Sequence, residues 1–129
     1  MRPLLVDTHA FLWFAFDDPR LSARAAAEMA SASTKLILSA ASLWEMAIKH
    51  QIGKLRLEIP FAVFVERFVL GTDVVVAPVE LPAILEYAAL PLHHRDPFDR
   101  LLIAEARARG CPILTSDDAF AAYAVETIW

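Results

Sequence analysis

Four acidic residues, far apart in the chain, are the side chains that could do chemistry together: Asp7, Glu45, Asp99 and Asp117. Asp7 directly follows the apolar run "PLLV", and Asp117 comes just after "PILTS". Ligand sites in open parallel sheets lie beyond the carboxyl ends of the strands. If both runs are strands, these two acids lie at the edge where a site is expected.

Glu45 lies in "SAASLWEMAIKHQIG", residues 39–53, a predicted helix that is apolar on nearly every side. A carboxylate in such surroundings is costly unless it is paired, hydrogen-bonded or bound to a metal ion. Lys49 follows one helical turn later and could form an ion pair with it. A purely structural role for Glu45 therefore stays open beside a role in a metal site.

Two further acids begin the predicted helix in "HHRDPFDRLLIAEA", residues 93–106. Pro97 suits the first helical position, which makes Asp96 the N-cap. Asp99 shares a helical face with the apolar positions three, four and seven residues later. Its interaction with the helix dipole would supply only about 0.3–1 kcal/mol. We therefore expect Asp96 to cap the helix and Asp99 to point toward the sheet and the site.

Converging carboxylates repel one another, which raises their pKa values unless a cation is present. Hard oxygen ligands are what Mg²⁺ and Mn²⁺ prefer, so the four acids predict a site for one or two such ions. His9, His93 and His94 lack zinc-ligand spacing. We expect the His93–His94 pair to form a solvated turn or a substrate contact.

Short apolar runs alternate with helical patterns along the chain, which predicts one α/β domain over residues 1–129 with a mainly parallel sheet. Apolar and polar residues hardly alternate in the predicted strands, which fits a sheet covered by helices on both faces. The predicted strands are 3–7, 35–39, 73–79, the start of 111–120, and 125–129. The predicted helices are 8–16, 21–33, 39–53, 61–71, 80–91 and 95–110.

The composition argues for a packed protein and against a purely charge-driven nucleic-acid binder. Apolar residues make up 57% and charged residues 22%, and the net charge is −4. RNA binding would thus need a local basic patch or metal ions. The single cysteine, Cys111, can form no intramolecular disulfide, which fits a reducing cytoplasm. No apolar run approaches the roughly 18–20 residues of a membrane span.

Four motifs together resemble those of the PIN domain, and in particular of VapC-type toxins: "LLVDTHAFLW", "SLWEMAIK", "HRDPFDRLLIAEA" and "ILTSDDAF". The resemblance covers essentially the whole chain. It implies a three-layer α/β/α fold with four to five strands. The implied activity is metal-dependent hydrolysis of RNA that leaves a 5′-phosphate and a 3′-hydroxyl.

The resemblance also implies the roles of individual residues. The family's four catalytic and metal-binding acids fall on Asp7, Glu45, Asp99 and Asp117, with Asp118 as an alternative for the fourth. The accompanying hydroxyl residues, which orient carboxylates or water, fall on two threonines, Thr8 and Thr115. Basic residues near these motifs, which could contact RNA, are Arg95, Arg100, His93 and Lys49.

VapC-like toxins are typically homodimers, and each is neutralised by a VapB-like antitoxin laid into an apolar groove. We expect both partners here. A haloacid dehalogenase-type enzyme would need an aspartate where this chain has His9, and a receiver domain would need a lysine after its last strand. The alternative that remains is a catalytically inert PIN-like module that binds RNA or protein.

Overall fold

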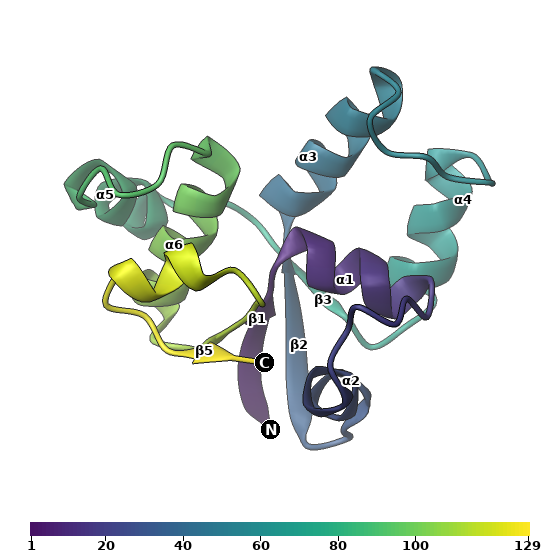
Figure 1. Cartoon of the computed structure of the whole chain (residues 1–129), viewed down its shortest axis with the longest axis horizontal. Helices are drawn as coiled ribbons and strands as arrows, with labels where there is room; N and C mark the ends of the chain where they lie inside the picture. The colour runs from purple at the N-terminus through teal and green to yellow at the C-terminus, as the bar shows by residue number, and fades with distance from the viewer.

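The computed structural model describes residues 1–129 and contains one five-stranded sheet (Figure 1). The strand order is β3-β2-β1-β4-β5, and every pairing is parallel. The strands are β1 (Arg2–Val6), β2 (Thr34–Ser39), β3 (Val75–Ala77), β4 (Ile113–Leu114) and β5 (Thr127–Ile128). The predicted α/β class with a parallel sheet is confirmed.

Helices fill the connections between the strands, as the sequence predicts. They are α1 (Thr8–Ala15), α2 (Ala23–Ala30), α3 (Ala40–Gln51), α4 (Phe61–Val65), α5 (Leu81–Ala89) and α6 (Pro97–Arg109). The segment predicted as one helix over 61–71 changes type, because α4 continues as the π-helix η1 (Glu66–Leu70). A 3₁₀-helix, η2 (Asp118–Ala122), follows β4. None of these helices is both long and apolar enough to cross a membrane.

The sheet is the middle of three layers. Leu4 and Val6 of β1 pack into one apolar cluster, and Leu5 packs into another, because successive strand residues point to opposite faces. The first cluster includes side chains of α1 to α4, and the second includes α6 and η2. In Figure 1, α1, α3 and α4 accordingly lie on one side of the strands and α5 and α6 on the other.

The strand order reverses between β1 and β4. From β1 the chain moves outward to β2 and β3, and it then returns to build β4 and β5 on the other side of β1. Such a switch point opens a crevice at the carboxyl ends of the two strands. Asp7 directly follows β1, and Thr115 directly follows β4.

Side-chain caps fix the helices that begin at this edge. Ser39 caps α3 by accepting from the backbone of Ala41. The Asp96 Oδ1 atom accepts from Phe98 N at 2.8 Å and from Asp99 N at 3.3 Å. The predicted capping role of Asp96 is thus confirmed, and it sets the first turn of α6, which carries Asp99.

Candidate metal centre

Asp7 is buried at the end of β1, with 6% of its surface exposed. Its Oδ1 accepts from Ala10 N at 2.8 Å, so it also caps α1, and its Oδ2 accepts from the Thr115 hydroxyl at 2.6 Å. Burial raises the pKa of this carboxyl, against the effect of both hydrogen bonds. Each carboxylate oxygen keeps a further lone pair, so the group can still bind a cation.

Glu45 projects from α3 and is also buried, with 2% exposed. Its Oε1 accepts from the Thr8 hydroxyl at 2.8 Å, and its Oε2 accepts from Lys49 Nζ at 2.7 Å. The Thr8 hydroxyl also lies 2.9 Å from Ser42 Oγ. The ion pair considered from the sequence is therefore present, and it holds Glu45 in place from one side while Thr8 holds it from the other.

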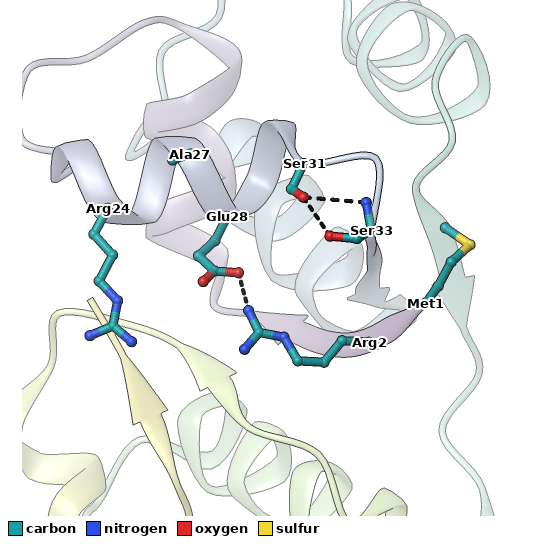
Figure 2. Close-up of a pocket in the computed structure, with 7 residues that line it drawn as sticks. All are labelled: Met1, Arg2, Arg24, Ala27, Glu28, Ser31 and Ser33. Carbon is teal, nitrogen blue, oxygen red and sulfur yellow. Dashed lines mark hydrogen bonds and ion pairs between the residues drawn. The ribbon is translucent and has the colours of Figure 1, made fainter.

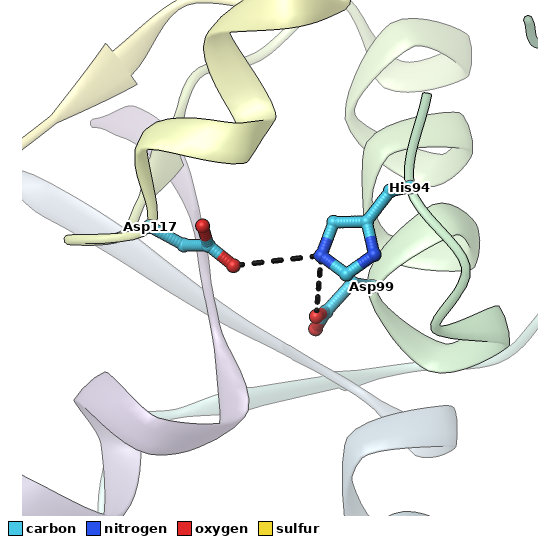
Figure 3. Close-up of side chains that lie close together, drawn as sticks. All are labelled: His94, Asp99 and Asp117. Carbon is cyan, nitrogen blue, oxygen red and sulfur yellow. Dashed lines mark ion pairs between the residues drawn. The ribbon is translucent and has the colours of Figure 1, made fainter. Parts of the chain in front are cut away.

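The tightest set of potential ligand atoms belongs to His94, Asp99 and Asp117 (Figure 3). One atom from each lies within 4.8 Å of the other two. His94 Nε2 is 3.2 Å from Asp99 Oδ2 and 3.5 Å from Asp117 Oδ2. Asp118 is not in this group, and Asp7 and Glu45 lie outside it. Of the two roles expected for the His93–His94 pair, the solvated turn is wrong for His94, because its side chain is 18% exposed and contacts both carboxylates. A substrate contact stays a prediction.

Asp99 has a strongly raised pKa. Burial and then the neighbouring Asp96 carboxylate raise the pKa of Asp99 to about 7, and Glu45 and Asp7 add smaller effects. His94 acts in the opposite direction. A carboxyl in this state releases its proton readily when a divalent cation arrives.

The hydrogen bonds of His94 determine which of its nitrogens carries the proton. The backbone N–H of Asp96 donates to His94 Nδ1 at 3.1 Å, so Nδ1 must present a lone pair. The ring proton is then on Nε2, which faces the two carboxylates. In this arrangement His94 is a hydrogen-bond donor to Asp99 and Asp117, and it has no lone pair on Nε2 to offer a metal.

The basic residues expected near the site have different surroundings. His93 and Arg95 are exposed, and Lys49 is bound to Glu45. Arg100 is buried, with 6% exposed, and donates to the Pro91 carbonyl and the Tyr123 hydroxyl. We therefore correct its assignment as an RNA contact: Arg100 lies on the covered side of α6, where it holds the preceding loop.

The sequence interpretation missed one buried acid, Glu105 on α6, which is 1% exposed. Its Oε1 accepts from Ser39 Oγ at 2.6 Å, its Oε2 has no partner, and burial raises its pKa. The available signal was its position between Ala104 and Ala106, in the apolar stripe that faces the sheet.

A cavity of about 730 Å³ lies at the amino ends of the strands, at the opposite edge from these acids (Figure 2). Two pairs of its polar side chains contact each other, and the exposed Arg24 has no ion pair. Arg2 pairs with Glu28, and Ser31 bonds to Ser33. The cavity therefore offers no unpaired carboxylate to hold a metal ion.

Several solved structures have the same fold. VapBC2 from Rickettsia felis, solved with a promoter DNA fragment, has a TM-score of 0.75 at 12% identity and covers 98% of this chain and 97% of its own. FitAcB from Neisseria gonorrhoeae has a TM-score of 0.66 at 19% identity, covering 98% and 96%. VapC20 from Mycobacterium tuberculosis, a sarcin-ricin loop cleaving toxin, has a TM-score of 0.64 at 22% identity, covering 95% of each.

A search of curated proteins gave no significant sequence match. The sequence model of the PIN domain matches residues 4–126, which is nearly the whole chain. The expected three-layer fold is confirmed by the structural likeness. On these grounds the chain belongs to the PIN domain family.

Proposed function

We propose that this protein is a metal-dependent ribonuclease that hydrolyses RNA phosphodiester bonds. The observation that carries the proposal is the closeness of Asp99 and Asp117 at the switch-point edge of the sheet, with Asp7 and Glu45 near enough to raise the pKa of Asp99. Membership of the PIN family, whose nucleases typically use divalent metals, supports it. The inert binding module is disfavoured because clustered carboxylates give such a protein no benefit.

The donor set fits Mg²⁺ or Mn²⁺. Asp99 and Asp117 lie closest together, and Asp7 approaches from β1 with spare lone pairs. Glu45 already accepts from Thr8 and Lys49, so we place it at the site through a water molecule. When bound, one or two ions would neutralise the site and supply an activated water for attack on phosphorus.

The chain's own residues prepare the site for that chemistry. Thr115 holds Asp7, Thr8 holds Glu45, and the His94 Nε2–H group bridges Asp99 and Asp117. These contacts fix carboxylate directions before any ligand binds, which lowers the reorganisation needed at the reaction step. His93, Arg95 and Lys49 remain candidate RNA contacts beside the acids.

We further propose that the protein is the toxin of a toxin–antitoxin pair that acts in the cytoplasm. The similar structures of VapBC2 and FitAcB support this reading. An apolar groove of about 440 Å³, lined by Phe11, Phe14, Met29 and Phe68 among others, is suited to a VapB-like antitoxin. Exposed apolar side chains on α3 and α5, including Trp44 at 64% and Leu85 at 63%, suit a homodimer.

The test is RNA cleavage by the purified protein with Mg²⁺ or Mn²⁺, and its loss in EDTA. Asp7→Asn and Asp99→Asn should each reduce cleavage at least about a hundredfold, because each removes a charged metal ligand. Asp73→Asn is the matched control, since Asp73 is exposed and forms no ion pair. Full metal-dependent activity in either site variant would refute the assignment. An absence of both cleavage and carboxylate-dependent Mn²⁺ binding would favour the inert module.

A further inference from the structure

A pocket of about 410 Å³ opens between α1 and the end of α3. Its lining includes Trp13 of α1 and two basic residues that follow α3, Lys54 and Arg56. Thr8 and Lys49 also line it, and both donate to Glu45. The pocket therefore shares two residues with the surroundings of Glu45, although none of the four acids lines it. We call it the Trp13 pocket.

Two positive charges in the Trp13 pocket have no carboxylate partner. Arg20 is engaged by Asp18 at 2.8 Å, and Lys49 is engaged by the buried acid of α3. Lys54 and Arg56 are exposed, and neither forms an ion pair within 4.0 Å. In a protein of net charge −4, these two cations form a local positive region directly beside an acidic one.

The segment that carries these cations is held in place by α3. Gly53 adopts a φ of 80°, which turns the chain back along the helix. The backbone N–H groups of Lys54 and Leu55 both donate to the Lys49 carbonyl, at 2.8 and 2.9 Å. The His50 ring nitrogen Nδ1 lies 3.2 Å from the Leu55 carbonyl oxygen. The two charges are thus presented from an ordered turn, which lowers the entropy cost of binding an anion.

Aromatic rings line the same pocket. The His9 and Trp13 rings lie 6.1 Å apart, centroid to centroid, and the Arg20 guanidinium lies 4.8 Å from the Trp13 ring. Proteins that bind single strands combine cations for the phosphates with aromatic rings for the bases. The volume also falls in the range of roughly 300–1,000 Å³ that holds small ligands.

We propose that the Trp13 pocket binds the single-stranded RNA segment adjacent to the cleaved phosphate. Lys54 and Arg56 contact backbone phosphates, and a base packs against His9 or Trp13. This inference rests on the proposed ribonuclease function and names the part of the chain that holds the substrate. An acidic peptide would use the two cations but would leave the aromatic rings unused.

The experiment measures binding of a fluorescein-labelled 12-nucleotide single-stranded RNA by anisotropy, in EDTA, across a salt series. The Lys54→Ala/Arg56→Ala variant should bind roughly tenfold more weakly, and its log–log salt dependence should be shallower by about 1.4, because two phosphate contacts are lost. Arg24→Ala/Arg67→Ala removes the same charge from exposed residues outside the Trp13 pocket and should leave binding nearly unchanged.

Two further measurements locate the effect. Calorimetric Mn²⁺ affinity should be the same in the Lys54→Ala/Arg56→Ala variant and the wild type, since neither residue belongs to the acid group. The indole N–H signal of Trp13, assigned with Trp13→Phe, should shift when RNA is added. Unchanged RNA binding in the double variant would overturn the inference.

A glutamate-rich peptide serves as the competing occupant. If that peptide binds the wild type and not the double variant, while RNA binds both equally, the pocket accepts an acidic peptide and the inference is wrong. If the wild type binds RNA through the pocket but does not cleave it with Mn²⁺, the proposed ribonuclease function is wrong and the inference that the pocket binds RNA is retained.

Discussion

At the scale of single residues, Asp99 combines a structural position with unfavourable electrostatics. It occupies the first turn of α6, where a helix favours an acid, yet burial and Asp96 raise its pKa to about 7. Between about pH 4 and pH 7, Asp99 is therefore protonated in the folded chain and ionised in the unfolded chain, where its pKa is near 3.8. Folding stability falls as pH rises between these values.

Asp99→Asn should consequently stabilise the metal-free protein at pH 8, by about 1–2 kcal/mol after screening by solvent is allowed for. The gain should shrink as pH falls through 7 and should vanish below about pH 4, where the carboxyl is neutral in both states. Urea unfolding in EDTA at several pH values measures it. A gain that is independent of pH would contradict the stated cause.

His94 should act as a donor to the carboxylates and not as a metal ligand. His94→Gln places an amide N–H near the position of Nε2 and should retain Mn²⁺ affinity within about threefold. His94→Ala removes the N–H that contacts the Asp99 and Asp117 carboxylates and should weaken Mn²⁺ affinity roughly tenfold. Pulsed electron paramagnetic resonance of bound Mn²⁺ should show no coupling to an imidazole nitrogen. Such a coupling would show direct ligation and refute the tautomer argument.

The roles of Asp96 and Asp99 can be distinguished from the sequence, because Pro97 marks the start of the helix and the apolar residues that follow mark its buried face. It did not place His94 in the site, since the ring's direction depends on the Tyr123 hydroxyl, which accepts from His94 N at 2.8 Å across 29 residues. The burial of Glu105 could be inferred from its place in the apolar stripe, but its partner Ser39 could not, because Ser39 lies on another element. Contacts between distant segments leave little trace in one sequence.

At the scale of secondary-structure elements, α6 sets the geometry of the centre through its N-terminus. The Asp96 cap, the loop that carries His94, and Asp99 in the first turn all meet there. The predicted helix over 95–110 begins at Pro97 in the structure and ends at Arg109, followed by Gly110 with a φ of 64°. The strands predicted at 73–79 and 125–129 are shorter than expected, because only Val75–Ala77 and Thr127–Ile128 pair with a neighbour.

Asp96 offers a way to separate capping from charge. Asp96→Asn keeps a capping oxygen but removes a negative charge that raises the pKa of Asp99. Mn²⁺ binding should then persist to lower pH than in the wild type. Asp96→Ala should show the same shift and also lose about 0.5–2 kcal/mol of stability. Calorimetric titrations from pH 5 to 8, with thermal unfolding, measure both effects. Equal stability of the two variants would contradict the capping role.

At the scale of the whole molecule, the site joins segments from both halves of the chain. Asp7 follows β1, Glu45 lies on α3, and Asp99 and Asp117 come from the last third of the sequence. A cation bound by these segments should link them in the folded state only. The parallel sheet could be predicted from the alternation of strands and helices in the sequence. The strand order that brings β1 beside β4 could not be predicted in this way.

Mn²⁺ should therefore raise the stability of the folded protein by mass action. At a free concentration a hundred times the dissociation constant, the gain should be about 2.7 kcal/mol. Thermal unfolding with and without EDTA measures it. The effect should be lost in Asp99→Asn and retained in Asp73→Asn. A wild-type unfolding temperature that does not respond to Mn²⁺ would argue against a metal centre formed by these acids.

The position of β1 between β2 and β4 also determines when the site can exist during synthesis. The ribosome makes Asp7 before it makes the Thr115 hydroxyl that holds it and the Asp117 carboxyl. A nascent chain can complete much of one layer while the acids remain unassembled. The proposed activity thus requires β4 and the segment that follows it, because a nascent chain that lacks them cannot bring the four acids together.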